Sequence, residues 1–131
     1  MKYKVCIPTA GIGSRLGNLK KNLNKSLVNV GGKPVISHII EKFGTSAEFV
    51  IPIGFGGEAV TEFINLAYPK LNVNFIKIDK FQGEGSGLGY TLSKSKEFLQ
   101  APFYFISCDT LIKNSIPEYN YNWVGFSKKD N

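Results

Sequence analysis

Residues 4–16 read Lys-Val-Cys-Ile-Pro-Thr-Ala-Gly-Ile-Gly-Ser-Arg-Leu, a short apolar run followed at once by a glycine-rich loop. The run predicts a buried strand over Lys4–Ile7. Glycines after such a strand let the backbone approach a bulky anion and turn its N–H groups towards it. Arg15 adds a guanidinium fork that suits phosphate oxygens. The segment therefore predicts either an anion-binding loop or a plain glycine turn with a solvated arginine.

Strand and helix patterns alternate along the rest of the chain. Three further apolar runs predict strands, at Phe49–Ile53, Val73–Ile78 and Phe103–Ser107. Other segments predict a short extended piece at Ser26–Val30 and helices over Pro34–Phe43, Glu58–Tyr68 and Leu88–Leu99. Such alternation implies parallel pairing with right-handed crossovers, and strands apolar on both faces need cover on both sides. We therefore expect an α/β fold with an open, mostly parallel, Rossmann-like sheet of order 3-2-1-4 and helices on both faces.

The length and composition of the chain favour a single domain over residues 1–131. Hydrophobic residues make up 43% and charged residues 20%, which argues against a disordered chain. No apolar run reaches the roughly 18 residues of a membrane-spanning helix, and the N-terminus lacks the apolar stretch of a signal peptide. Two cysteines make no disulfide scaffold, so we expect free thiols and a cytoplasmic protein.

Basic residues outnumber acidic ones, and several of them gather near the glycines. Sixteen Lys+Arg against ten Asp+Glu give a net charge of +6, which suits an anionic partner. Neither of two familiar phosphate loops fits, because Leu16 replaces the third glycine of a dinucleotide fingerprint and Leu27 the first glycine of a Walker A loop. What is left is a glycine loop with one cation, Arg15, and a second, Lys25, further along the chain.

Two other segments follow predicted strands and could reach the same edge of the sheet. Asp109 comes directly after the last apolar run, where a carboxylate could share Mg²⁺ with phosphate oxygens or could merely cap a turn. The stretch 82–89, Gln-Gly-Glu-Gly-Ser-Gly-Leu-Gly, could let a flat base lie on its backbone near the positive end of a helix at Gly87, or could be a flexible connector. Ligands bind at this edge in open α/β sheets, so we expect Asp109 beside the Gly11 loop.

Together these motifs resemble the nucleotidyltransferases that activate sugar phosphates, and the phosphocholine cytidylyltransferases that share their fold. The resemblance spans nearly the whole chain and rests on segments 10–16, 24–30, 32–34, 85–89 and 108–111. It implies a GT-A-like nucleotidyltransferase fold. It also implies an enzyme that transfers a nucleoside monophosphate from a nucleoside triphosphate to a sugar phosphate or similar phosphomonoester. Pyrophosphate would be released, and the product would serve capsule or other surface-glycan synthesis.

The resemblance also implies a role for individual residues. Four residues of the first loop would bind the nucleotide (Ala10, Gly11, Gly13 and Ser14), and three of the later loop would lie near its base (Gln82, Gly85 and Gly87). Arg15 would neutralise the departing pyrophosphate, and Lys25 would contact the triphosphate and the attacking phosphate. Asp109 would ligate Mg²⁺. Positioning and charge neutralisation suffice for this reaction, since the attacking phosphate is already ionised.

The chain departs from the family pattern in sequence and in length. Asn24 stands where members usually carry a proline before the signature lysine, and Gly17-Asn-Leu-Lys20 replaces the usual Pro-Leu-Thr. Residues 24–27, Asn-Lys-Ser-Leu, are closer to the choline-type enzymes than to the hexose type. Family chains are typically nearly twice as long, and their later half supplies the acceptor pocket and a second metal-binding aspartate. We therefore expect an N-terminal, truncated nucleotide-binding part, which could pair as a homodimer.

Two other functional classes stay open at this point. A non-catalytic nucleotide-binding or regulatory module would fit the absence of a matching second aspartate. A nucleic-acid binder is suggested only by the charge, and its affinity for oligonucleotides would depend steeply on salt. The expected partners are a nucleoside triphosphate and a sugar or alcohol phosphate, with no nucleic acid and no membrane span.

Overall fold

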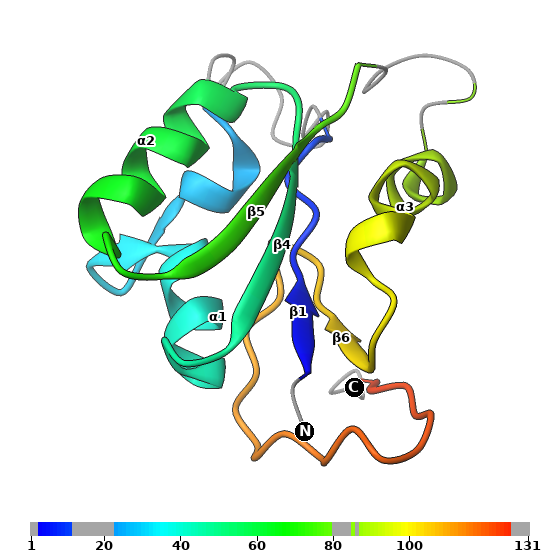
Figure 1. The fold of residues 1–131 in the computed structure, drawn as a ribbon. Helices are drawn as coiled ribbons and strands as arrows, with labels where there is room; N and C mark the ends of the chain where they lie inside the picture. Colours follow the sequence, from blue (N-terminus) through cyan, green and yellow to red (C-terminus); the bar gives the residue numbers. More distant parts are fainter. Residues whose placement is uncertain (1–2, 12–22, 80–84, 86, 127–131) are drawn as a thin grey trace, which may run out of the picture.

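A computed structural model describes residues 3–11, 23–79, 85 and 87–126 of the chain. Its main sheet has four parallel strands in the order β5-β4-β1-β6 (Figure 1). The strands span Lys4–Cys6 (β1), Glu48–Ile53 (β4), Asn72–Lys77 (β5) and Phe103–Phe105 (β6). Counting only the four long apolar runs, this is the order 3-2-1-4. The predicted parallel sheet and its topology are confirmed.

Helices cover both faces of this sheet. On one face lie α1 (Val35–Phe43) and α2 (Gly57–Ala67), and on the other α3 (Leu88–Ser95) and the 3-10 helix η3 (Lys96–Phe98) (Figure 1). Val5 packs in the α1–α2 core, whereas Cys6 packs near η3, because successive strand residues face opposite sides. Among the described residues, no helix is long and apolar enough to cross a membrane.

The larger core lies between the sheet and the helices α1 and α2. Its fully buried side chains include Ile36, Ile40, Phe49, Ile51 and Ile64. Continuous apolar runs in β1 and β4 thus reflect burial from both sides, as the sequence indicated. The centres of β1 and β4 are buried, so polar side chains can lie at the turns that follow their carboxyl ends.

Three local predictions were wrong. Ser26–Val30 is not one extended piece, because Lys25–Leu27 form a 3-10 helix (η2) and only Asn29–Val30 (β2) are extended, paired antiparallel with Lys33–Pro34 (β3). Pro34 caps α1 instead of starting it, since its extended ψ of 148° belongs to this hairpin. The helix predicted over Leu88–Leu99 ends at Ser95 and continues only as the 3-10 helix Lys96–Phe98.

The segment after β6 passes below the opposite, amino-terminal edge of the sheet (Figure 1). Aromatic side chains meet there, with the ring of Tyr104 about edge-on to Tyr3, Tyr119 and Trp123. The Tyr104 hydroxyl donates to the Pro117 carbonyl at 2.7 Å, which fixes the segment against the strand. These described C-terminal residues therefore close the amino-terminal edge and leave the carboxyl edge to other loops.

The two thiols are expected to react slowly in the folded chain. Burial raises the pKa of Cys6 to about 12, and that of Cys108 to about 11. Both cysteines are free, and Cys108 lies beyond β6 and is only half-buried. Because the thiolate is the nucleophile, we expect reaction with a disulfide reagent at pH 8 to be at least about tenfold slower than in denaturant. Equal rates in the folded and unfolded chain would contradict this.

Candidate nucleotide site

The carboxyl edge of the sheet brings together four segments that lie far apart in sequence. They are the turn after β1 (8–11), the 3-10 helix η2, the loop after β4 (54–56) and the turn after β6 (107–109). Backbone hydrogen bonds join the first and third, with the Thr9 N–H donating to Pro52 at 2.8 Å and the Phe55 N–H donating to Ala10 at 3.4 Å. This is the edge at which open parallel sheets bind ligands.

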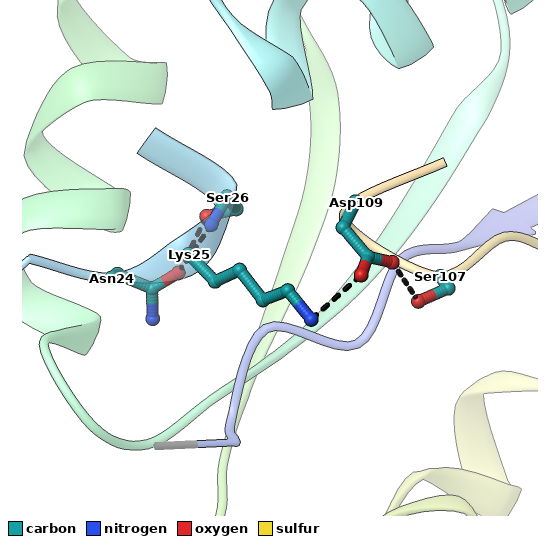
Figure 2. A network of polar contacts seen from close by, with 5 residues as sticks. All are labelled: Asn24, Lys25, Ser26, Ser107 and Asp109. Carbon is teal, nitrogen blue, oxygen red and sulfur yellow. Dashed lines mark hydrogen bonds and ion pairs between the residues drawn. The ribbon is translucent and has the colours of Figure 1, made fainter. Parts of the chain in front are cut away.

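Asn24 links three of these segments from a buried position. Asn24 is only 1% exposed. The amide nitrogen donates to the carbonyls of Thr9, at 2.8 Å, and Phe55, at 2.6 Å. The amide oxygen accepts from the N–H of Ser26 at 3.0 Å and from its hydroxyl at 2.7 Å (Figure 2). The residue before Lys25 is therefore bound to the ends of two strands.

Lys25 and Asp109 form an ion pair across this edge. The ammonium lies 2.6 Å from one carboxylate oxygen, and the Ser107 hydroxyl donates to the other at 2.6 Å (Figure 2). The hydrogen bond from Lys25, followed by that from Ser107, holds the pKa of Asp109 below its usual value. Both side chains remain partly exposed, at 31% for Lys25 and 41% for Asp109. The arrangement presents one cation and one anion to solvent, each able to exchange its partner for a ligand.

Comparison with known proteins identifies relatives over most of this chain. No family model matches it. The bifunctional protein GlmU of Methanococcus vannielii is 31% identical over 125 residues, which are 93% of this chain and 28% of that protein. A probable glucose-1-phosphate cytidylyltransferase of Bacillus subtilis is 30% identical over 100 residues, 74% of this chain and 38% of that protein. The solved structure of CTP:phosphocholine cytidylyltransferase from Streptococcus pneumoniae matches with a TM-score of 0.74 and 27% identity, over 93% of this chain and 51% of that one.

Over most of its length the chain is similar to proteins named as cytidylyltransferases. It spans between 28% and 51% of the lengths of these three relatives. The parallel sheet with helices on both faces is the fold that it shares with the S. pneumoniae enzyme. The resemblance that the motifs indicated and the predicted fold are both confirmed.

Six of the ten residues predicted for a nucleotidyltransferase site lie in the described part of the chain: Ala10, Gly11, Lys25, Gly85, Gly87 and Asp109. The other four, Gly13, Ser14, Arg15 and Gln82, lie outside the described residues. The structure brings Lys25 into contact with Asp109. Ala10 lies in the turn after β1, where its carbonyl accepts from the Phe55 N–H. Gly87 precedes α3 on the other face of the sheet, where its carbonyl accepts from Thr91 at 3.2 Å.

The residues at this edge fit a metal only if a substrate shares it. Among the described residues, no group of three or more His, Cys, Asp or Glu side chains could hold a metal ion. Asp109 offers one partly exposed carboxylate. Mg²⁺ is commonly held by one or two carboxylates together with substrate phosphates and water. The donor set therefore suits a metal bound between Asp109 and a triphosphate, as in the sequence-based expectation, and does not suit a metal held by these residues alone.

Two residues of the site were not recognised as such from the sequence. Ser107 donates to Asp109 from two positions upstream, a local pattern that the spacing Ser-Cys-Asp could have indicated. In the sequence, Asn24 stands out only as a departure from the family pattern. Its place before a turn is typical of a capping residue. Nothing local could have revealed its bonds to Thr9 and Phe55, which lie 15 and 31 positions away.

Gly56, next to Asn24, is expected to resist substitution. It adopts φ of +66°, and an added Cβ would lie 3.3 Å from the Asn24 Cβ. Because L-residues pay for left-handed backbone, we expect Gly56→Ala to lower the free energy of unfolding by about 1–2 kcal/mol. Gly89→Ala is the control, since α3 leaves open space there and alanine favours helices by up to about 1 kcal/mol. Urea unfolding measures both, and equal destabilisation by the two changes would contradict the argument.

Proposed function

We propose that this chain is the nucleotide-binding part of an enzyme that transfers a nucleoside monophosphate from a nucleoside triphosphate to a phosphomonoester, releasing pyrophosphate. The observation that carries the proposal is the Lys25–Asp109 pair, 2.6 Å apart at the carboxyl edge of a parallel sheet. A cation beside an accessible carboxylate suits a substrate that is both polyanionic and metal-bound. The related enzymes, named as nucleotidyl-transferring proteins, support the same reading.

In this proposal each residue neutralises or orients charge. Lys25 leaves Asp109 and binds the triphosphate and the attacking phosphate, bringing two anions together. Arg15 neutralises the departing pyrophosphate. Backbone groups of Ala10, Gly11, Gly13 and Ser14 bind the nucleotide. Mg²⁺, when bound, would offset negative charge on phosphate oxygens. Asp109 would hold it, with Ser107 orienting the carboxylate.

The base and the acceptor are finer parts of the proposal. Gln82, Gly85 and Gly87 are proposed to lie near the base. The Bacillus and Streptococcus relatives are both named cytidylyltransferases, so CTP is the first triphosphate to test. Their names include glucose 1-phosphate and phosphocholine, which represent the sugar phosphates and alcohol phosphates proposed as acceptors. Supply of precursors for capsule or other surface glycans would follow from either acceptor.

A nucleotide-binding module without turnover is the second candidate. It rests on the same Lys25–Asp109 pair, since binding of a triphosphate alone would also explain a cation beside an accessible carboxylate. Such a module would bind the triphosphate through Lys25 and the glycine loops, and it would form no product. The two candidates share the site and differ only in what happens after binding.

The test is calorimetric binding of ATP, CTP, GTP, UTP and dTTP to the 131-residue chain, each with and without Mg²⁺. Saturable, magnesium-dependent binding of at least one of them is expected. Pyrophosphate release is then measured with glucose 1-phosphate and with phosphocholine. Release supports the transferase, and binding without release supports the module. Failure to bind any triphosphate would overturn both, and the mass of the chain in solution tests the proposed homodimer in the same samples.

A further inference from the structure

We propose that Asn24 is a positioning residue, which places Lys25 opposite Asp109 by tying the Lys25 turn to the ends of strands β1 and β4. The proposal rests on the proposed function only in assigning Lys25 to phosphate binding. Its mechanical part, that the Asn24 amide orders the Lys25 side chain, concerns the unliganded chain. The two parts are therefore open to separate measurements.

The Asn24 amide uses its whole hydrogen-bonding capacity. A primary amide has two N–H donors and an oxygen with two lone pairs. Both donors are taken by carbonyls, of Thr9 and Phe55, and the oxygen accepts twice from Ser26. Turning the amide over would put its oxygen against two carbonyl oxygens, so the network admits one orientation only. A residue 1% exposed and fully bonded cannot shift without breaking several bonds at once.

The strand ends to which Asn24 is bound are themselves fixed. Thr9 donates both its N–H and its hydroxyl to the Pro52 carbonyl, each at 2.8 Å, which joins β1 to the central strand β4. Phe55 lies two residues after the end of β4 and donates its N–H to the Ala10 carbonyl, at the beginning of the first glycine loop. Asn24 therefore connects the turn that carries Lys25 to the start of that loop and to the rigid centre of the sheet.

The position of the Lys25 backbone matters because its side chain is long. Holding a lysine side chain in one geometry costs the rotamer entropy of its four flexible bonds. The Leu27 N–H bonds the Asn24 carbonyl at 2.9 Å, which closes the turn around Lys25. With the backbone held at both sides, the ammonium reaches Asp109 across a fixed gap (Figure 2). Without the Asn24 amide, the Lys25 turn would not be held in place, and the ammonium would not be kept opposite Asp109.

A helix-capping role alone does not account for this geometry. A cap of η2 needs only the bond from the Ser26 N–H to the Asn24 oxygen. The two amide N–H bonds contribute nothing to that cap, because they go to segments 15 and 31 positions away. These two bonds fix the position of η2 relative to the turn after β1 and the loop after β4.

The first experiment measures the order of the Lys25 ammonium by nitrogen relaxation in the unliganded chain. Asn24→Ala is expected to abolish the ordered signal, and the milder Ser26→Ala, which removes one bond to the amide oxygen, is expected to weaken it. Ser95→Ala is the matched control, because it removes a buried hydroxyl bonded to Thr91 in α3, on the other face of the sheet. If Asn24→Ala does not fold, Ser26→Ala decides. Unchanged order in the folded variants would overturn the proposal.

The second experiment is a double-mutant cycle on CTP affinity, or on the affinity of whichever triphosphate binds most tightly. Lys25→Met is expected to cost about a hundredfold in the unchanged chain and about tenfold in the Asn24→Ala background, a coupling of about 1.4 kcal/mol. In the Ser26→Ala background the coupling should be smaller but of the same sign. A purely structural Asn24 would leave the two costs equal, as Ser95→Ala should. If no triphosphate binds at all, the proposed function fails, while the ammonium measurement still decides whether Asn24 orders Lys25.

Discussion

Replacing Lys25 by methionine is expected to weaken triphosphate binding about a hundredfold and to slow any turnover by more. Methionine keeps the length and apolar stem of the side chain but removes the ammonium. A hydrogen bond to a charged group contributes about 1.5–3 kcal/mol, or roughly 10- to 150-fold in affinity. The cost in turnover should be larger, because charge grows on the phosphates in the transition state. Calorimetry and pyrophosphate release measure the two effects.

Lys33→Met is the matched control for this prediction. Lys33 forms an ion pair of 2.9 Å with Glu41 rather than with Asp109, and both side chains are nearly half exposed. Exposed pairs of this kind contribute about 0–1 kcal/mol. We therefore expect the control to change triphosphate affinity by no more than a few fold. Similar losses in the two variants would point to general attraction by positive charge and would contradict a specific role for Lys25.

The Lys25 variant has a second expected effect, of opposite sign. In the unliganded chain the ammonium occupies the Asp109 carboxylate at 2.6 Å. A divalent cation that arrives without nucleotide must displace it. Removing the ammonium should therefore tighten the binding of Mn²⁺ alone while it weakens the binding of the triphosphate. A variant that loses both affinities together would have lost the shape of the site rather than one charge.

The fold was predictable because its strands and helices carry strong local patterns. Phe49–Ile53 is apolar without interruption, which in an alternating chain indicates a strand covered on both faces. Such strands pair in parallel with right-handed crossovers, and few arrangements remain. Errors occurred where local patterns compete with tertiary contacts. Residues 26–30 look extended by composition, but capping by Asn24 makes their first half a 3-10 turn.

The site was only partly predictable. Lys25 and Asp109 could be chosen because each follows a recognisable motif and parallel strands bring their carboxyl ends to one edge. These two residues lie far apart in the sequence, and their direct contact depends on the position of η2. That placement comes from Asn24, whose amide nitrogen donates to two distant backbone carbonyls. Since every residue has a backbone carbonyl, no sequence pattern marks the carbonyls to which a side-chain amide will donate.

The stability of the Lys25–Asp109 pair should depend on pH with a defined sign. The pKa of Asp109 lies below its usual value of 3.8 because Lys25 and Ser107 bond the ionised form. A lowered pKa means that the pair contributes its full stability above that value and loses it as the pH falls through the lowered pKa. The difference in unfolding midpoint between the unchanged chain and Asp109→Asn should therefore be constant from about pH 5 to 8 and shrink only below that range.

Asp109→Asn is expected to abolish the gain in triphosphate affinity that Mg²⁺ produces. Asparagine keeps the size of the side chain and an oxygen for the Ser107 hydroxyl, but it cannot offer an anionic ligand to a hard cation. Affinity without metal should be equal or higher, because Lys25 no longer has to leave a carboxylate. Calorimetry with and without Mg²⁺ measures both. Glu48→Gln removes a carboxylate that lies beside Lys4 at the amino-terminal end of β4, and it should leave the magnesium effect intact. An intact magnesium effect in Asp109→Asn would mean that the metal is held by the triphosphate or by other residues, and Asp109 would then serve only to hold Lys25 in place.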